Sequence, residues 1–478
     1  MGKKPPKEAD VRTVCLLHSS LRLTVDWCDI ARVTIDMLSD VALLEIFGFY
    51  VDGARNNTWN TLLHVCRKWR DVVFGSPRRL NLQLYCTPST PVRETIDAWP
   101  LLPIQVFGYG PSCEEWGVDN IIAVLEHNDR IRELNLTDYP KSQMEEVFAA
   151  MQQSFPALEV LWLTSTSETE VVPASFLGGS APRLQTLLLD SVPFPGLPKL
   201  LLSATHLVDL HLHDIPHSGY FSPEAIATGL SALTSLERLY IIFKSPRSRP
   251  DQRRRPLPLT RSLLPSLTHF EFKGVSEYLD DLVARIDAPL LDELDITFFH
   301  QLIFDTPQLT QFINRTPKII AFEGAFAEFF NSSVFVTTTD QALRLSIPCR
   351  QSDWQLSSLA QVFSTNFISA IEHLYIQEGA YYPPSWQDDI ETGQWLELLH
   401  RLTAVKYLHI SPIFTPRIAP TLQELAGGRA TEVLPALQTL YLEETLPSGV
   451  QETIDKFVAA RELAGHPIVV SRWEDWGL

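Results

Sequence analysis

Short apolar alternations recur along most of the chain. They follow the pattern L-x-x-L-x-L or a close variant, with starts at Ile131, Leu158, Leu184, Leu207, Leu236, Leu267, Leu291, Ile371, Val405 and Leu437. Successive side chains of a strand point to opposite faces, so each L-x-L places its two apolar residues on one face of a short strand. Apart from the interval between Leu291 and Ile371, neighbouring starts lie roughly 23 to 34 residues apart, which indicates a repeated structural unit.

The stretches between the alternations are typical of helices. Examples are SQMEEVFAAMQQ (Ser142–Gln153) and SPEAIATGLSAL (Ser222–Leu233). Proline often stands just before the alternation, as Pro156 and Pro435 do, and it ends the preceding helix because it cannot continue one. Each unit is therefore predicted to be a helix, a turn and a short strand. One such unit cannot bury its leucines alone, whereas stacked units can, so we expect an α/β solenoid.

Two segments depart from this regular unit. From about Thr316 to Ser346 the pattern is weak, with only ALRLSI resembling it, so the array is predicted to be irregular there. The end of the chain (447–478) is predicted to form a helix, a break at Gly465-His466-Pro467 and a short strand, and to cap the array.

A different pattern precedes the array. Leu38, Val41 and Leu44 recur at i, i+3 and i+6, which predicts a short amphipathic helix. After a polar break, one side of a second predicted helix is formed by Leu62, Cys66, Trp69 and Val73. Two or three helices in about 45 residues bury too little apolar surface to be stable alone, so we expect a partner or neighbour to cover them.

Composition and charge exclude several classes of protein. The formal charge of −18 argues against general electrostatic attraction to nucleic acid or anionic membranes. We find neither a long uncharged apolar stretch nor a signal-peptide pattern. The six cysteines form no C-x-x-C pair, which favours a reducing compartment, the cytoplasm or the nucleus. Residues 1–36 are expected to be a poorly ordered tail, and the arginine-rich 244–256 an inserted loop that is either solvated or a nuclear-import or phosphorylation segment.

The sequence offers no catalytic constellation. The phosphate-binding, zinc-protease and serine-hydrolase motifs are missing, and Cys66 lies on an apolar helix face where a reactive thiolate is not expected. His211 and His213 lie two residues apart with Asp209 alongside, a spacing that suits a metal, but 13 histidines make chance pairs common. We therefore expect a protein that is not an enzyme and that has no cofactor and no metal.

Two resemblances to known families follow from these motifs. The L-x-x-L-x-L array resembles the leucine-rich-repeat family over roughly Leu80 to Leu446, although the Asn usual in that family's inner turn is missing and Tyr139 occupies that position in the first repeat. LSDVALLEIF and LLHVCRKWRDV resemble the F-box, with Ser39 where that family usually has Pro. The second block and the closing FVAARELAGHPIVVSRWE are similar to a large fungal F-box group.

The F-box resemblance implies a function. F-box proteins dock on the Skp adaptor of an SCF ubiquitin ligase (Skp, cullin, F-box), and a second domain holds the target protein. The implied order is a tail (1–36), an F-box (37–80), a leucine-rich-repeat-like array (81–446) and a cap (447–478). The adaptor-facing residues it implies are Leu38, Val41, Leu44, Ile46, Phe47, Leu63, Val65, Cys66 and Trp69. The alternative is a repeat scaffold without a ligase role, in which Trp69 and its neighbours cap the first repeat.

The positions between the leucines define a candidate surface for the target protein. They face away from the buried leucines, along the open side of the predicted sheet. The candidates are Trp162, Asp190, Asp209, Tyr240, Glu271, Asp295, Tyr375, Tyr407 and Tyr441. Aromatic rings supply rigid contact area and carboxylates favour a basic partner. Alternatively, the aromatic residues pack only on neighbours of the same face.

Overall fold

The chain divides into two compact units. A computed structural model describes residues 38–52, 62, 64–75, 82–89, 91–99, 101–108, 117–167, 169–250, 260–299, 306–320, 322–349, 352–364, 368, 370–379, 392–426, 428–442 and 446–472. Unit 1 is Met1–Leu80 and unit 2 is Asn81–Leu478. The expected tail of residues 1–36, Leu63 and residues 251–256 of the arginine-rich loop lie outside the described residues.

Unit 1 contains helices α1 (Asp40–Asp52) and α3 (Arg67–Gly75). Ser39 begins α1, because its Oγ accepts a hydrogen bond from the Ala42 amide at 3.2 Å. The prediction of one helix through Leu62 and Val73 is wrong at Cys66, where the helical structure is interrupted. Cys66 instead begins α3: its carbonyl accepts from the Arg70 amide at 3.2 Å and its Sγ from the Trp69 amide at 3.5 Å.

The two helices of unit 1 share a small core. The Phe47 and Trp69 rings pack with their centroids 4.7 Å apart, and Leu43, Leu44, Val72 and Val73 are buried. Lys68 Nζ donates to the Leu38 carbonyl at 2.8 Å, which ties α3 to the chain that enters α1.

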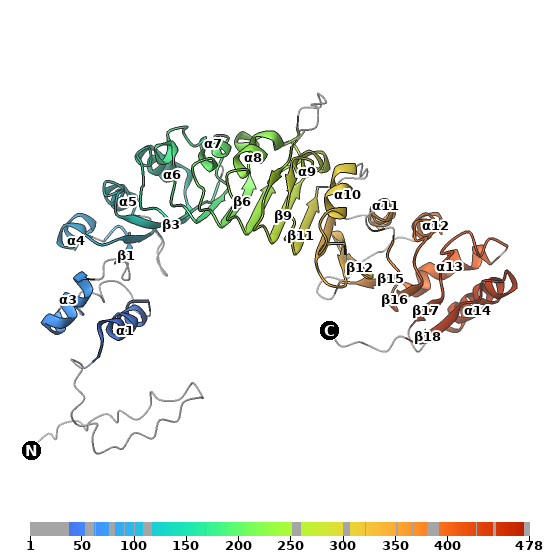
Figure 1. Cartoon of the computed structure of the whole chain (residues 1–478). Coiled ribbons are helices and arrows are strands. Elements are labelled where there is room, and N and C mark those ends of the chain that lie inside the picture. Colours follow the sequence, from blue (N-terminus) through green and yellow to red (C-terminus); the bar gives the residue numbers. More distant parts are fainter. Residues whose placement is uncertain are drawn as a thin grey trace, which may run out of the picture. The chain divides into compact units, whose positions relative to one another are not determined.

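Unit 2 is built on one long sheet of 16 strands (Figure 1). Most neighbours in the sheet are parallel and follow one another in the sequence. The strands in sheet order are β1 (Leu82–Tyr85), β2 (Ile104–Phe107), β3 (Ile131–Tyr139), β4 (Val160–Ser165), β5 (Thr186–Asp190), β6 (Asp209–Ile215), β7 (Arg238–Phe243), β9 (His269–Gly274), β11 (Glu293–Phe298), β14 (Leu343–Pro348), β13 (Ser333–Thr338), β12 (Gly324–Phe330), β15 (His373–Glu378), β16 (Tyr407–Ile410), β17 (Thr439–Leu442) and β18 (Val469–Arg472). Strands β8 (Ser262–Leu263) and β10 (Ile286–Asp287) form a separate pair.

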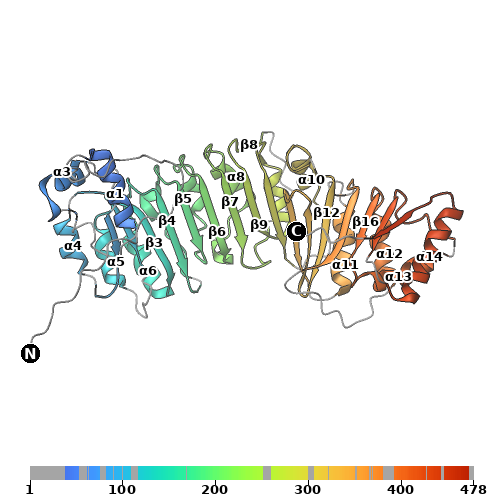
Figure 2. The same ribbon diagram turned by 90° about the horizontal axis from the view of Figure 1, so that it is seen from below.

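The helices of unit 2 lie on one side of this sheet and leave its other face open (Figures 1 and 2). They are α4 (Val92–Ala98), α5 (Val118–Leu125), α6 (Lys141–Ala150), α7 (Leu197–Leu201), α8 (Pro223–Leu230), α9 (Ser276–Val283), α10 (Pro307–Asn314), α11 (Ser352–Phe363), α12 (Thr392–Arg401), α13 (Thr415–Leu425) and α14 (Ser448–Leu463). Between them are two short 3-10 helices, Phe176–Gly179 and His217–Gly219.

The alternations of the sequence place the strands and the core. Every L-x-x-L-x-L segment contains a strand, and its L-x-L residues are buried, as Leu187 and Leu189 of β5 are. The two helices predicted from SQMEEVFAAMQQ and SPEAIATGLSAL are confirmed as α6 and α8. Unit 2 is thus a mixed α/β structure around a large, mainly parallel sheet.

The weak segment of the sequence is an antiparallel insertion. Strands β12, β13 and β14 pair antiparallel through short turns, while β14 is parallel to β11 and β12 is parallel to β15. No helix lies between these three strands, so the segment lacks the helix–strand period that marks its neighbours. The sheet nevertheless continues through it without a break.

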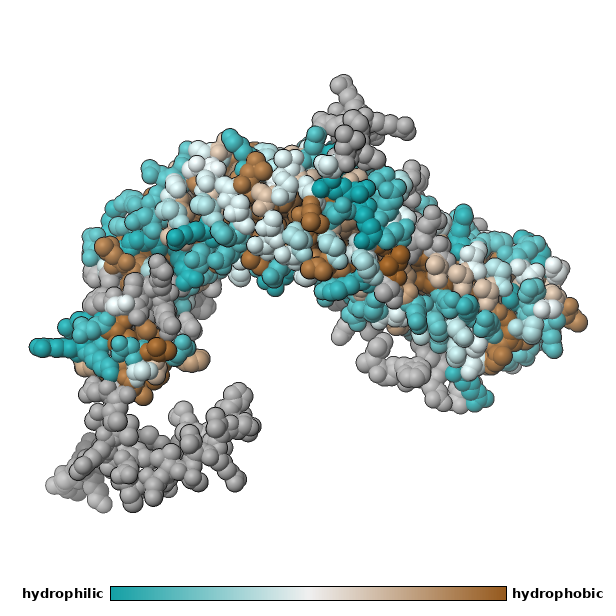
Figure 3. All heavy atoms as spheres, in the orientation of Figure 1, coloured by the Kyte–Doolittle hydropathy of each residue, from teal (hydrophilic) through white to brown (hydrophobic). Residues whose placement is uncertain are grey.

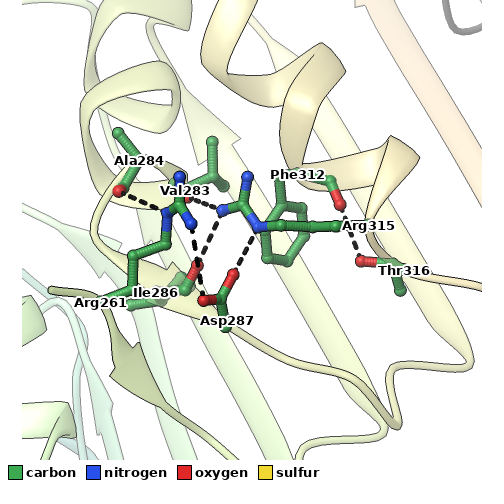
Figure 4. A network of polar contacts seen from close by, with 8 residues as sticks. All are labelled: Arg261, Val283, Ala284, Ile286, Asp287, Phe312, Arg315 and Thr316. Carbon is green, nitrogen blue, oxygen red and sulfur yellow. Dashed lines mark hydrogen bonds and ion pairs between the residues drawn. The ribbon is translucent and has the colours of Figure 1, made fainter.

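Within unit 2, a polar network joins neighbouring strand–helix repeats on the helical side of the sheet (Figure 4). Arg315 Nη2 donates to the carbonyls of Val283 and Ile286 at 2.7 and 3.0 Å, and Arg315 Nε donates to Asp287. The Arg315 guanidinium also lies 5.3 Å from the centre of the Phe312 ring. Arg315 follows α10 directly, so this network connects the end of α10 to the end of α9 and to β10.

The helix and strand predicted for the end of the chain are confirmed as α14 and β18. Strand β18 pairs in parallel with β17 and so extends the sheet by one strand. Helix α14 packs on the array partly through Arg461, whose side chain is buried.

Candidate interaction surfaces

One residue from every strand forms a continuous row across the open face of the sheet. The registered partners, from β1 to β18, are Tyr85, Phe107, Asn135, Trp162, Leu188, His211, Tyr240, Glu271, Asp295, Arg344, Thr337, Phe326, Tyr375, His409, Tyr441 and Ser471. We call this set the central row. Each member except Ser471 is next to buried strand residues whose side chains point to the helices, so the row faces away from the core.

The central row is rich in stacked rings toward the C-terminal end of the sheet. The ring centroids of Phe326 and Tyr375 are 4.7 Å apart, those of Tyr375 and His409 4.2 Å, and those of His409 and Tyr441 4.0 Å. Burial between these rings, followed by repulsion from His373, lowers the pKa of His409 to about 4. His409 is therefore neutral at physiological pH, and the stack is a flat and largely apolar strip.

A second ring cluster lies on β6, β7 and β9. Tyr240 stacks on His211 with centroids 4.2 Å apart, and His269 lies 5.0 Å from Tyr240 on the other side. Burial, followed by repulsion from His213, lowers the pKa of His211 to about 4. The cluster thus combines a tyrosine and two imidazole rings with the carboxylates that follow it in the row, Glu271 and Asp295.

The sequence-predicted candidates for the open face are distributed over three adjacent rows. Six belong to the central row: Trp162, Tyr240, Glu271, Asp295, Tyr375 and Tyr441. Tyr407 lies in the neighbouring row and stacks on His373 at 4.3 Å. Asp190 lies opposite His213. Asp209 is buried, and its Oδ2 accepts from Arg238 Nη2 at 2.8 Å, so its charge is already neutralised within the sheet.

The four candidate tyrosines do pack on neighbours of the same face, as the alternative interpretation expected. Tyr240, Tyr375, Tyr407 and Tyr441 each stack on a histidine, yet all four remain partly exposed. Their packing therefore fixes the ring orientations and still leaves ring surface for a partner.

Several residues of this surface were missed by the sequence analysis. His409 stands between Leu408 and Ile410, at the same position of the alternation as the chosen tyrosines, so the pattern itself marks it. Phe326 and Arg344 belong to the antiparallel insertion, where no repeat pattern gives the register. The metal considered at His211 and His213 loses Asp209 as a ligand, because Arg238 occupies that carboxylate.

The second candidate surface is on unit 1. Val41, Ile46, Phe49 and Val65 are exposed, with Phe49 at 80% of its full accessibility. Among the adaptor-facing residues implied by the resemblance, Leu38, Cys66 and Trp69 are half-buried. Leu44 and Phe47 are buried, so they support the helix and do not offer surface. Phe49 was not predicted, although it follows Val41 by eight residues on α1.

Helix α1 is apolar on both sides. At 100° per residue, its buried residues Leu43, Leu44 and Phe47 occupy one side, and the exposed Val41, Ile46 and Phe49 occupy the other. Glu45 is the polar residue on the exposed side, between Val41 and Phe49. A helix with apolar residues on both sides is normally covered on both. Figure 3 shows apolar residues on the surface of unit 1 among polar ones.

Comparisons with known proteins give no family. No protein-family model matches the chain, and a search of curated proteins finds no similar sequence. In the part of the chain that the structure describes, no helix has the length and apolar character needed to span a bilayer.

Proposed function

We propose that this protein is the substrate-receptor subunit of an SCF-type ubiquitin ligase. One observation carries the proposal: α1 exposes Val41, Ile46 and Phe49 on the side opposite its buried residues. Exposed apolar residues of this size in one small module mark an interaction surface, because leaving them in water forfeits the free energy of burying them. The matches LSDVALLEIF and LLHVCRKWRDV identify the expected partner as a Skp-type adaptor, and through it a cullin.

The arrangement of the chain supports the same proposal. Residues 37–80 take the role of the F-box, and the strand–helix units of residues 81–446 take the role of an irregular leucine-rich-repeat solenoid. The protein itself performs no chemistry in this role; it raises the local concentration of a target near the ligase. A ligase of this kind works in the cytoplasm or the nucleus.

The target protein is expected on the open face of the sheet. The central row offers Trp162, Tyr240, Tyr375 and Tyr441 as partly exposed rings, and Glu271 and Asp295 as carboxylates. A partner segment with basic and apolar residues complements this combination. The chain's overall charge of −18 favours the approach of such a partner.

The adaptor contact is testable on the full chain. Wild type and the variants Phe49→Glu and Val65→Glu are mixed with a purified fungal Skp adaptor, and binding is measured by calorimetry. Both positions are exposed, so the variants keep the core of unit 1. We expect each variant to weaken binding at least tenfold, because each places a charge in an apolar interface. Leu463→Glu is the matched control: this leucine is 90% exposed, lies on α14, and should leave binding unchanged.

Failure of the wild-type chain to bind any Skp adaptor would contradict the proposal and favour the scaffold alternative. Equal loss of binding in Leu463→Glu would also count against it, because the effect would then not be specific to unit 1. The target is sought by capturing proteins from extracts with wild type and with Trp162→Ala plus Tyr441→Ala, and comparing what each retains.

A further inference from the structure

Three metal-binding side chains converge on the open face where β9 and β11 run side by side. His269 and Glu271 are two residues apart on β9, and Asp295 is the registered partner of Glu271 on β11. The ligand atoms of these three side chains all lie within 4.8 Å of one another. A single ion placed between them can reach all three with small rotations of the side chains.

The carboxylates of Glu271 and Asp295 face each other without the cationic or hydrogen-bonding partners that usually stabilise two like charges. Glu271 and Asp295 are directly opposite each other on neighbouring strands, where like charges destabilise the sheet. Both are half-buried, and neither forms a hydrogen bond or ion pair with a described residue. Burial first, and then the charge of Asp295, raises the pKa of Glu271; burial also raises the pKa of Asp295. His213, His269 and Lys273 lower the pKa of Glu271, and Arg344 and His269 lower that of Asp295. Neither Lys273 nor Arg344 forms an ion pair with these carboxylates.

The histidine is oriented as metal-binding histidines are. His269 Nδ1 lies 2.8 Å from Glu293 Oε2, so Nδ1 donates its proton to that carboxylate. In a neutral imidazole this hydrogen bond leaves the lone pair on Nε2. Nε2 is buried and has no hydrogen-bond partner among the described residues. A carboxylate behind a histidine in this manner is the usual outer support of a metal ligand.

We infer that His269, Glu271 and Asp295 bind one divalent transition-metal ion, with Zn²⁺ the best match. One imidazole and two carboxylates suit Zn²⁺, which takes nitrogen and oxygen ligands at about 2.0–2.2 Å. Ca²⁺ and Mg²⁺ prefer oxygen ligands alone, so the histidine argues against them. Three protein ligands leave a fourth position, which water or a donor of a bound partner fills. The inference does not rest on the proposed ligase function.

The test is metal binding by the full chain. The protein is stripped with a chelator and titrated with Zn²⁺ in competition with a chromophoric chelator. We expect one equivalent to bind, and Glu271→Gln and Asp295→Asn each to weaken binding at least tenfold. Glu293→Gln should weaken it about tenfold, because it removes only the support of the histidine. Circular dichroism checks that the variants remain folded.

Two controls and one direct measurement separate the possible outcomes. Asp190→Asn removes a carboxylate of the same face on β5 and should not change the affinity. His213→Ala removes one histidine of the pair His211 and His213 on β6 and should also leave the affinity for Zn²⁺ unchanged. X-ray absorption of the Zn²⁺-loaded wild type should show one imidazole and otherwise oxygen ligands. The inference is overturned by the absence of binding, by unchanged affinity in Glu271→Gln and Asp295→Asn, or by two imidazoles or a thiolate around the ion.

Discussion

Arg461 is a buried cation satisfied entirely by backbone oxygens in its described contacts. Its Nη1 donates to the carbonyls of Ala430, Val433 and Leu434 at 3.1–3.3 Å, and its Nη2 donates to Leu437 at 3.4 Å. Burial lowers its pKa, yet an arginine remains charged in proteins. These carbonyls belong to the segment between α13 and β17, so one side chain of α14 fixes the whole connection.

Replacing Arg461 by Met should therefore lower the stability of the folded chain strongly. Arg461→Met keeps an unbranched apolar side chain but leaves several buried carbonyls without donors. We expect the free energy of unfolding to fall by about 2–5 kcal/mol. Denaturation by urea, followed by circular dichroism, measures it. The control is Arg429→Met: Arg429 is exposed and, among the described residues, its side chain pairs only with Glu432, so the expected loss is below about 1 kcal/mol. Similar losses for both variants would contradict this account of Arg461.

At the scale of elements, the sequence predicted the parts of the fold that rest on local periodicity. The L-x-L alternations marked the strands because burial of one face requires a period of two, and the prolines marked the helix ends. The turn chemistry at Cys66 was not predictable from apolar spacing, since Cys66 has the same spacing as a core residue and acts as a cap. Neither was the insertion β12–β14, because antiparallel pairing through short turns leaves no long period in the sequence.

The candidate surfaces were predicted less completely than the fold. Alternation identifies which side chains face outward, and it found Tyr240, Tyr375 and Tyr441 in this way. It does not give the register between strands, and register decides that Glu271 lies opposite Asp295 and that Asp209 meets Arg238. Long-range pairing of this kind appears only once the strands are aligned.

The stack around His409 makes the sheet sensitive to acid. His409 has a pKa of about 4 in the folded chain and an ordinary value of 6.5. Between these values the unfolded chain binds more protons than the folded chain, so stability falls as the pH falls from about 6.5 to about 4 and changes little further below. The expected contribution is about 1–3 kcal/mol. His409→Phe keeps a ring between Tyr375 and Tyr441 and removes the titration.

This prediction is checked by measuring the free energy of unfolding of wild type and His409→Phe from pH 7.5 to pH 4. The difference between the two proteins should shift in favour of the variant as the pH falls, because only the wild type has to keep this histidine neutral. Parallel curves over the whole range would show that His409 is not held neutral by the fold. Titratable groups that do not interact with His409 behave equally in both proteins and cancel in the difference, so only His409 and its neighbour His373 contribute to it.

At the scale of the whole molecule, the division after Leu80 implies that unit 2 is structurally independent. The strands of the long sheet, from β1 to β18, all come from residues 82–472. A chain of residues 81–478 should therefore fold, with a Tm within about 3 °C of the full chain. Ending the full chain at Leu446 is the contrasting truncation. It removes α14 and β18, deprives β17 of a partner and should lower the Tm clearly, as calorimetry would record. A similar Tm for both truncations would contradict this division of the molecule.

The central row has a spacing that a partner must match. Neighbouring strands are about 4.8 Å apart, so two steps along the row cover about 9.6 Å. An extended peptide advances about 3.3 Å per residue, and three of its residues cover nearly the same length. In a peptide laid across the strands, every third residue therefore lies over every second strand. Tyr375 and Tyr441 are two strands apart and partly exposed, so recognition by these two rings would then select a three-residue periodicity in the target, a signature that can be looked for in any captured sequence.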